Sequence, residues 1–426
     1  MNEVTNVLIG FELNREGSQI CYYDRTACEP ICVPTKVGTN LFLFPTALGK
    51  VRGRADWHFG LEAHYFGTLE KGICIDNLYD LALGTEGVEV DGETYSPADL
   101  LAIFLRESLK LLGLSSIVRS VEAIMVTSAH LTGELVRNIR KAFISLGFSR
   151  DQILLQNEME SFYYYAFSQR QDFWKKRIGL FRISENEVTF SALTEDRAAR
   201  PSTVRLSTAR SLTFSGDEAI RDLEMCEYAV TSLGDDEYSG ILLAGSSFEP
   251  AKMQQTVAFL VEDRRRVYYG DNLFVKGACY AAMARRENQN QNMRGRLYMS
   301  EDLIETNVAI DVTDGGKSVR YPLITAGVNW YESAAGCELL LAEGDTLTFV
   351  TTDLAGMNEE TVELPLEGLP KRPPKTTRIA LSVSCVSADH CDVEAEDLGL
   401  GAFFPATHRI WRMTIPLRNR NEEGWE

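Results

Sequence analysis

The chain has 426 residues, and its 43 lysine and arginine side chains face 61 aspartate and glutamate side chains, giving a formal net charge of −18. This length allows two or three domains with sizeable cores, and a hydrophobic content of 45% is ordinary for a globular protein. The acidic balance argues against binding to nucleic acid or to an anionic membrane surface. We therefore expect a cytoplasmic protein with no nucleic-acid partner and no membrane partner.

The N-terminus has no basic segment followed by an apolar stretch, and no run approaches the roughly 18 apolar residues of a membrane helix. The nine cysteines are an odd number. The pairs that are close in sequence, Cys28 with Cys32 and Cys385 with Cys391, lack the usual zinc-knuckle spacing, and no metal site is predicted. We expect these cysteines to be reduced and buried in a reducing cytosol.

The first structural signal is a β-hairpin. Residues 7–13 are apolar, residues 14–17 form a turn, and residues 18–24 return as a second strand. Glu12 ends the first strand, where it could face a metal ion or be a solvated strand-end carboxylate.

Alternating helix and strand signals follow. Ser96 is a good N-cap and Pro97 suits the first helical position, so a helix is predicted to Leu112. A strand at 121–128 and a helix at 131–146 come next, and the apolar run at 153–157 leads through Glu158 into an aromatic helix. An N-cap acid at the helix start explains Glu158 equally well without any catalytic role.

A second hairpin is predicted at residues 178–193, with Arg182 at the end of its first strand and the turn Ser184-Glu185-Asn186. Residues 241–244 then form a short apolar run typical of a buried strand. Gly245, Ser246 and Ser247 make a turn that lets backbone approach a ligand closely. Pro250 predicts a helix start, and a second helix carrying Gly277 begins near Asn272. An ordinary strand-turn-helix of any α/β protein explains the same pattern.

The last part of the chain changes character after a polar segment at residues 285–292. Short strands separated by turn signals are predicted at 308–312, 346–350, 361–366 and 377–386. Such spacing favours an antiparallel sandwich. The tail after Leu417 is charged and is expected to be disordered.

Taken in order, these segments resemble the actin and heat-shock chaperone superfamily, and most closely its DnaK-type branch. The two hairpins correspond to the two phosphate loops of that family, residues 241–283 to its adenosine-binding element, and residues 364–397 to its substrate-binding β-domain. The resemblance implies an α/β, actin-like (ribonuclease-H-like) two-lobed domain followed by an all-β sandwich. Its domains would be lobe I at 1–168, a shortened lobe II at 169–287 and the β-sandwich at 295–420.

The resemblance also implies site residues. Glu12 stands where the family has an aspartate that acts on magnesium, and Glu158 falls on the family's catalytic-site glutamate. Gly245, Ser246, Ser247 and Gly277 would surround the nucleoside. The implied ligand is ATP or ADP, with Mg²⁺ if the protein hydrolyses ATP.

The phosphate loops depart from the family pattern in a way that opposes catalysis. Asn14 replaces a glycine of the first loop, Arg182 replaces the first aspartate of the second loop, and Ser184-Glu185-Asn186 replace its three glycines. A triphosphate cradle needs backbone N–H groups at close range, and an arginine cannot organise magnesium. The ATPase site is therefore predicted to be degenerate.

Three functional hypotheses follow. The first is a chaperone-like binding or scaffold protein that could keep a nucleoside pocket and engages a protein or peptide partner through the β-sandwich, for instance at the loop 325–328. The alternative is a divergent magnesium-dependent ATPase chaperone that uses Glu12 and Glu158. A weaker alternative is an actin-like filament or cell-division protein.

Overall fold

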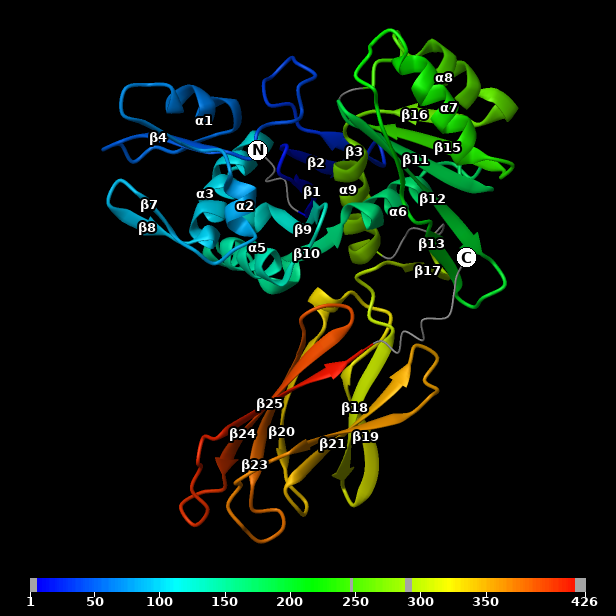
Figure 1. Ribbon diagram of the computed structural model, residues 1–426. Coiled ribbons are helices and arrows are strands. Elements are labelled where there is room, and N and C mark those ends of the chain that lie inside the picture. The colour runs from blue at the N-terminus through cyan, green and yellow to red at the C-terminus, as the bar shows by residue number, and fades with distance from the viewer. Residues whose placement is uncertain (1–5, 246–247, 288–292, 418–426) are drawn as a thin grey trace. The chain divides into compact units, whose positions relative to one another are not determined.

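The computed structural model describes residues 6–245, 248–287 and 293–417 and divides the chain into two compact units, Met1–Met299 and Ser300–Glu426 (Figure 1). We call them the N-terminal unit and the C-terminal unit, and each is described by itself. The predicted tail after Leu417 lies outside the described residues.

The first sheet of the N-terminal unit has the strand order β10-β9-β1-β2-β3. Its strands are β1 (Val7–Leu13), β2 (Ser18–Asp24), β3 (Glu29–Cys32), β9 (Val121–Ser128) and β10 (Ile153–Asn157). The β1–β2 and β2–β3 pairs are antiparallel, whereas β9 runs parallel to both β1 and β10. The predicted first hairpin is thus β1–β2, and the strands that follow later in the chain extend the sheet on the other side of β1.

The second sheet repeats this arrangement. Its order is β16-β15-β11-β12-β13-β17, with β14 also paired to β12. The strands are β11 (Arg177–Ile183), β12 (Glu187–Asp196), β13 (Ser202–Leu206), β14 (Arg210–Thr213), β15 (Tyr238–Ala244), β16 (Arg266–Tyr269) and β17 (Arg296–Met299). The β11–β12 and β12–β13 pairs are antiparallel and the β11–β15 and β15–β16 pairs are parallel. Strands β13-β12-β11-β15-β16 therefore match β3-β2-β1-β9-β10 in both order and direction.

Two helices are exchanged between the sheets, since each follows a strand of one sheet but packs on the other sheet. Helix α6 (Glu158–Ser168) follows the last strand of the first sheet but packs its buried aromatic side chains against Ile178, Leu180 and Leu242 of the second. Helix α9 (Leu273–Glu287) follows β16 of the second sheet and packs on the first. The central helices also contact each other (Figure 1).

The outer faces of both sheets are covered by further helices. Helices α3 (Pro97–Leu109) and α5 (Gly133–Ser145) pack together, and Phe104 of α3 makes an edge-to-face contact with Phe11 of β1. Helix α7 (Arg221–Leu233) and helix α8 (Gln254–Leu260) cover the outer face of the second sheet, where Met225 and Leu260 join the core around Phe181. Each large sheet is the middle layer of an α/β/α arrangement.

Local sequence signals explain where α3 and α5 begin. The Ser96 side chain accepts a hydrogen bond from the Asp99 N–H in a complete capping box with Pro97 at the first turn, as predicted. Thr132 caps α5 through the Leu135 N–H. The helix predicted at Pro250 is wrong in its start, because α8 begins four residues later at Gln254 and Pro250 lies in the preceding turn.

The smaller elements of this unit lie mostly between β3 and β9. They are β4 (Leu48–Val51), β5 (His58–Phe59), α1 (Gly60–Gly67), β6 (Gly72–Ile75), α2 (Leu78–Ala82), β7 (Val88–Val90), β8 (Glu93–Tyr95), the 3₁₀ turns Lys110–Leu112, Arg150–Gln152 and Glu262–Arg264, and α4 (Ile117–Ser120). Strands β4, β5 and β6 form a separate three-stranded sheet.

The C-terminal unit consists of two four-stranded sheets with the orders β19-β18-β21-β22 and β20-β23-β24-β25. The strands are β18 (Thr306–Asp314), β19 (Lys317–Ile324), β20 (Ala334–Leu340), β21 (Thr346–Asp353), β22 (Glu360–Pro365), β23 (Arg378–Cys385), β24 (His390–Gly399) and β25 (Ile410–Pro416), with a 3₁₀ turn at Trp330–Glu332. All pairs are antiparallel. Alternate residues of β23 and β24 are buried, which places one face of their sheet on the interior.

The boundary between the units differs slightly from the expected one. Strand β17, at Arg296–Met299, pairs with β13 of the second sheet. These four residues therefore belong to the N-terminal unit, although the β-sandwich was expected to begin at residue 295.

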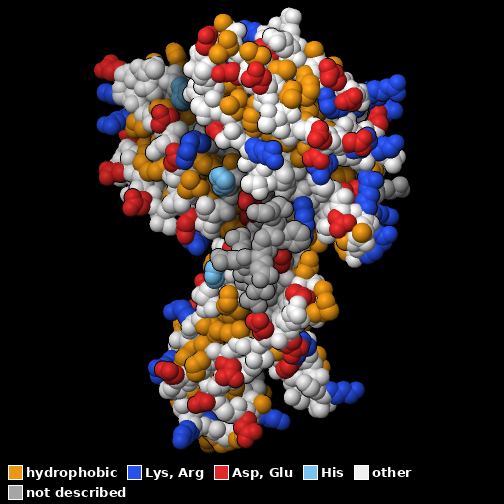
Figure 2. Space-filling view, turned by 45° about the vertical axis from the view of Figure 1, so that its right-hand side comes forward, with side chains coloured by type: hydrophobic (Ala, Val, Ile, Leu, Met, Phe, Trp, Pro, Cys, Tyr) orange, Lys and Arg blue, Asp and Glu red, His pale blue; other side chains and the backbone are white. Residues whose placement is uncertain are grey.

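In the described parts of the chain, no helix is both long enough and apolar enough to cross a membrane. Figure 2 shows acidic and basic side chains interspersed over the face in view, without a continuous basic region on that face.

Candidate functional site

Four polar residues meet between the two large sheets. Glu12 is the next-to-last residue of β1, and Asn14 lies in the turn of the first hairpin. Glu158 is the first residue of α6, and Arg182 lies near the end of β11. We call these four residues the central polar cluster. Because β1 and β11 are equivalent strands of the repeated sheets, the cluster joins equivalent places in the two halves of the unit.

Asn14 links the two carboxylates. Its side-chain Nδ2 donates to Glu158 Oε1 at 2.5 Å and to Glu12 Oε1 at 3.2 Å, and its Oδ1 accepts from the Ala129 N–H at 3.0 Å. The last bond orients the amide so that its N–H₂ group faces the carboxylates. Asn14 therefore fills the space in front of both acids.

Arg182 supplies the positive charge of the cluster. Its Nη2 lies 2.8 Å from Glu158 Oε2, and its guanidinium lies 5.0 Å from the centre of the Phe274 ring, within range of a cation–π interaction. Glu158 Oε2 has no partner with hydrogen-bond geometry among the described residues, so the contact with Arg182 is an ion pair without a well-directed hydrogen bond.

The environment of Glu12 favours its neutral form. Burial is the main cause that raises the pKa of Glu12 well above its ordinary value, and the negative charge of Glu158 raises it further. Arg182 and the Asn14 amide oppose this shift but do not cancel it. The second oxygen of Glu12 has no hydrogen-bond partner among the described residues.

These positions correct two expectations. Glu12 is only 7% exposed and is therefore a buried carboxylate rather than a solvated strand end. Glu158 does not cap α6, since Asn157 is the N-cap and accepts the Glu160 N–H at 2.8 Å. Among the described residues, no group of three or more His, Cys, Asp or Glu side chains could hold a metal ion.

The turn of the second hairpin is closed by its own hydrogen bonds. The Ser184 N–H donates to the Glu187 carbonyl at 2.8 Å, and the Glu187 N–H donates to Ser184 Oγ at 3.1 Å. Glu185 and Glu187 are exposed. The two N–H groups that flank this turn are thus engaged internally and are not directed at a ligand.

The predicted nucleoside residues lie in different settings. Gly245 has φ = +116°, and a Cβ there would lie 2.0 Å from the Ile183 carbonyl oxygen, so only glycine fits beside β11. Gly277 lies where α9 meets α6, and its Cβ would lie 2.0 Å from the Ser161 carbonyl oxygen. Both glycines are explained by close packing, and their contact with a nucleoside stays a prediction. Ser246 and Ser247 lie outside the described residues.

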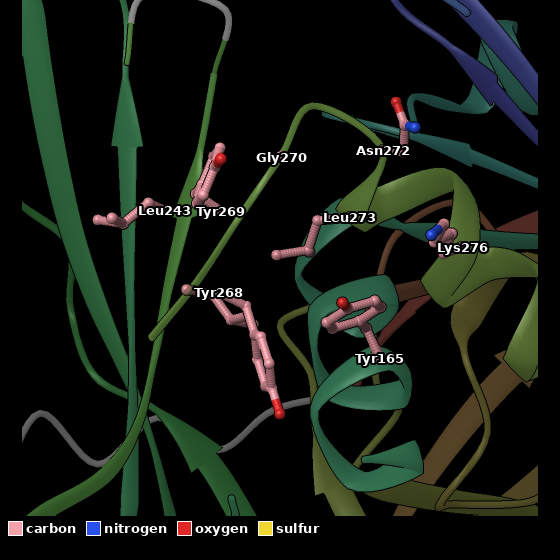
Figure 3. A pocket seen from close by; sticks show the side chains of 9 residues that line it. Tyr165, Leu243, Tyr268, Tyr269, Gly270, Asn272, Leu273 and Lys276 are labelled. Atoms are coloured by element: carbon pink, nitrogen blue, oxygen red, sulfur yellow. The ribbon is translucent and has the colours of Figure 1, made fainter. Parts of the chain in front are cut away.

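A small pocket lies between the edge of the second sheet and the first turns of α9 (Figure 3). Its volume is about 130 Å³, below the ~300 Å³ from which pockets for drug-sized ligands usually start. Its polar lining residues are Tyr165 of α6, Tyr268 and Tyr269 of β16, Asn272 and Lys276. Burial, with a smaller effect of Tyr268, raises the pKa of Tyr165 to about 12, so its hydroxyl remains a donor at neutral pH. No local sequence pattern indicates this pocket, because its walls come from distant segments.

The loop proposed for a peptide groove is tied down in the structure. The Gly327 N–H donates to the Ile304 carbonyl at 2.8 Å, and the Ile304 N–H donates to the Val328 carbonyl at 2.9 Å. The Ala326 N–H is also bound by Asn307 Oδ1. Val328 is 36% exposed, so the loop offers little apolar surface.

Comparison with known proteins places the chain in a family. The family model described as the C-terminal part of a family of unknown function (DUF5716) matches residues 29–301, which is more than half of the chain. The chain therefore belongs to this family. A second model, described as a domain of unknown function (DUF8552), matches residues 303–417. A search of curated proteins finds no match.

Proposed function

We propose that this chain is a chaperone-like binding or scaffold protein with a degenerate ATPase site. The observation that carries the proposal is the pairing of Arg182 with Glu158 at 2.8 Å in front of the two hairpins. In the resemblance that motivates it, these are the positions of a metal-orienting aspartate and of the catalytic glutamate.

The chemistry of the central polar cluster supports this proposal. A magnesium-bound triphosphate needs anionic oxygens for the ion and backbone or cationic donors for the phosphates. Here Arg182 already lies beside Glu158, and the Asn14 amide donates hydrogen bonds to both carboxylates. Burial also raises the pKa of Glu12. With two acids and a single cation, the cluster offers little attraction for a ligand as anionic as ATP.

The topology supports the architectural part of the proposal. Two sheets with the same five-strand order and direction, each completed by a helix from the other half, are what an actin-like, ribonuclease-H-like pair of lobes requires. On this proposal the N-terminal unit is a rigid platform, the C-terminal unit engages a protein or peptide partner, and the protein works in the cytoplasm. A nucleoside could still bind near Gly245 without its phosphates being activated.

The test is titration calorimetry of the full chain with ATP, ADP and adenosine, each with and without Mg²⁺. The proposal expects no magnesium-dependent gain in ATP affinity, with at most weak binding that is similar for the three ligands. Anisotropy of a labelled, extended apolar peptide should report binding that added nucleotide leaves unchanged. Peptide affinity that depends on Mg-ATP would contradict the scaffold proposal.

One observation favours the second candidate, a divergent magnesium-dependent ATPase. Glu12 and Glu158 come from segments far apart in sequence, yet both bind the same Asn14 amide, and two neighbouring carboxylates are a usual starting point for a magnesium site. For this candidate, Mg-ATP binding or slow hydrolysis should be lost in Glu158→Gln and kept in Glu185→Gln, whose side chain lies in the exposed turn. Equal behaviour of the two variants would exclude Glu158 as the active group.

A further inference from the structure

Two pairs of cysteines face each other across antiparallel strands. In the first sheet Cys21 of β2 is the register partner of Cys32 of β3. In the C-terminal unit Cys385 of β23 is the register partner of Cys391 of β24. The first pair was not expected, because Cys32 is closer in sequence to Cys28.

The hydrogen-bond pattern fixes the geometry of the first pair. The Val33 N–H donates to the Ile20 carbonyl at 2.9 Å, which makes Ile20 and Val33 a hydrogen-bonded pair. Hydrogen-bonded and non-hydrogen-bonded pairs alternate along an antiparallel ladder. The neighbouring pair, Cys21 with Cys32, is therefore non-hydrogen-bonded.

The second pair has the same geometry. The Val386 N–H donates to the His390 carbonyl at 3.1 Å, so the adjacent pair, Cys385 with Cys391, is non-hydrogen-bonded. The Cys385 N–H donates to the Ser333 carbonyl at 3.3 Å, on the side of β23 away from β24. It therefore does not point toward Cys391, which agrees with this assignment.

This geometry brings the thiols together. In a non-hydrogen-bonded pair the two Cα atoms are about 4.5 Å apart and the side chains lie on the same face of the sheet. Disulfides span Cα separations of about 4.4–6.8 Å. Both cysteine pairs meet this requirement in the folded backbone.

Each pair has one thiol at the edge of the interior and one inside it. Cys32 is 8% exposed and Cys385 is 9% exposed, whereas Cys21 and Cys391 are fully buried. Cys32 also interacts with the Asn272 side chain and the Lys276 charge, and both of these residues line the pocket in Figure 3. Two residues of the pocket lining therefore lie near the first pair.

We propose that Cys21–Cys32 and Cys385–Cys391 are redox modification sites, at which a low-molecular-weight disulfide converts each cross-strand dithiol into an intramolecular disulfide. The expectation that the cysteines are buried is wrong for Cys28 and Cys74, which are exposed. All nine are free thiols in the structure.

The chemistry is thiol–disulfide exchange in two steps. The thiolate of Cys32 or Cys385 attacks one sulfur of the reagent, a mixed disulfide forms, and one reagent thiol leaves with a proton. The buried partner then loses its proton, attacks the protein sulfur of the mixed disulfide and releases the second reagent thiol. Two protein thiols are oxidised and one reagent disulfide is reduced.

The reaction is expected to be slow at neutral pH. Burial raises the pKa of Cys385 to about 11 and that of Cys391 to about 12, and the hydrogen bond with Cys21 together with burial raises the pKa of Cys32. Because only the thiolate attacks, the sites respond to sustained oxidising conditions rather than to brief ones.

Oxidation of the first pair also changes a contact with α9. The Cys21 thiol donates to the Val275 carbonyl at 3.1 Å in the first turn of that helix. A disulfide has no S–H group, so this bond is lost when the pair closes. The first turn of α9 is therefore where hydrogen exchange should change on oxidation.

The test uses the full chain under native conditions with excess oxidised glutathione. The sample is then denatured, its remaining thiols are alkylated, and it is digested without reduction for mass spectrometry. The expected result is one linked peptide pair joining Cys21 to Cys32 and another joining Cys385 to Cys391, both lost on reduction with dithiothreitol. Cys28 is exposed, and its adduct with glutathione shows that the reagent was active.

Variants separate the outcomes. Cys28→Ser should leave the Cys21–Cys32 link intact, and Cys32→Ser should free Cys21 for alkylation. Cys391→Ser should leave Cys385 carrying glutathione, because its mixed disulfide then has no partner thiol to resolve it. Alkylation of both members of a pair in protein whose Cys28 carries glutathione would overturn the assignment for that pair. A link from Cys32 to Cys28 or Cys279 would overturn it as well. The wild-type map decides the question if a variant fails to fold.

Discussion

Arg182 occupies in the second sheet the position that Glu12 occupies in the first. Each is the sixth residue of the first strand of its repeat, β11 or β1, and the electrostatic interactions of Glu12 include both Glu158 and Arg182. Glu158 is therefore approached by an acid from one half of the unit and by a base from the other.

Removing the charge of Arg182 should destabilise the N-terminal unit. Arg182→Met keeps an aliphatic side chain but removes the positive charge that pairs with Glu158. The Glu158 side chain is only 3% exposed. Because the arginine itself is 43% exposed, we expect a cost of about 1–3 kcal/mol, below that of a fully buried pair. Hydrogen exchange of peptides from α6 and β11 is the measurement.

Arg177→Met is the matched control for Arg182. Arg177 lies on the same strand in an exposed ion pair with Asp236, and such pairs contribute at most ~1 kcal/mol. Equal protection losses in the two variants would show that the Glu158 contact has no special weight.

Glu12→Gln should remove a pH dependence of stability. The pKa of Glu12 is raised in the folded protein, so its contribution is fully present below the unfolded pKa of about 4.3 and is lost as the pH rises toward the folded pKa. Wild-type protein should therefore lose more thermal stability than Glu12→Gln between about pH 5 and pH 8. Glu16→Gln is the control, because Glu16 is exposed in the turn that follows β1. Its pH profile should match that of the wild type. An unchanged pH profile for Glu12→Gln would contradict the assignment.

Gly277→Ala should force the two central helices apart. The added methyl group would lie 2.0 Å from the Ser161 carbonyl oxygen, and an overpacked contact of this kind typically costs about 1–3 kcal/mol. Gly133→Ala is the control, because a Cβ at Gly133 meets nothing within 4 Å at the start of α5. That variant should be neutral or stabilised by up to ~1 kcal/mol. Urea unfolding followed by the fluorescence of buried tryptophan compares the two, and a neutral Gly277→Ala would refute the close helix contact.

Asp397→Asn should destabilise the C-terminal unit. The Asp397 side chain is fully buried and accepts from Arg372 Nη1 at 2.7 Å and Nη2 at 2.9 Å, and from Thr407 Oγ1 at 2.7 Å. Burial alone would raise its pKa, but these donors outweigh burial and hold the pKa below its usual range. Breaking such a pair costs about 3–5 kcal/mol. Thermal unfolding of the full chain, followed by hydrogen exchange of β24 peptides, measures the loss.

The pH dependence of Asp397 has the opposite sign to that of Glu12. A lowered folded pKa means that the stabilisation is present above the unfolded pKa of about 3.9 and is lost as the pH falls toward the folded value.

The control for Asp397→Asn is Glu394→Gln, which removes an exposed ion pair with Arg412 on the same sheet. This variant should change the free energy of unfolding by less than ~1 kcal/mol. A similar effect of both variants would remove the distinction between the buried and the exposed pair.

Local features of the fold could be predicted from the sequence because they depend on neighbouring residues. The hairpin at residues 7–24 follows from two apolar runs around a polar turn, and the start of α3 follows from Ser96 and Pro97. Pro250 misled the prediction of α8, since a proline that suits a helix start also suits the turn that precedes one.

The site was harder to predict because its contacts are non-local. Asn14 and Glu158 are 144 positions apart, and nothing in either segment indicates that one amide would bind both acids. The partner of Cys32 depends on the register of β2 and β3 rather than on sequence distance, so Cys28 was the wrong neighbour to consider. The mismatch of Arg182 with a phosphate loop was visible in the sequence, because it depends only on residue type.

The exchange of α6 and α9 has a consequence for any attempt to divide the N-terminal unit. After a cut between residues 168 and 169, the N-terminal fragment would carry α6 without the second sheet, which buries Phe162 and Phe167. The same fragment would lack α9, which covers Leu8 and Met125. Both fragments would present large apolar faces to water and would tend to aggregate. The two halves are therefore one cooperative folding unit, and they would be recovered as separate pieces only if they were expressed together and reassembled.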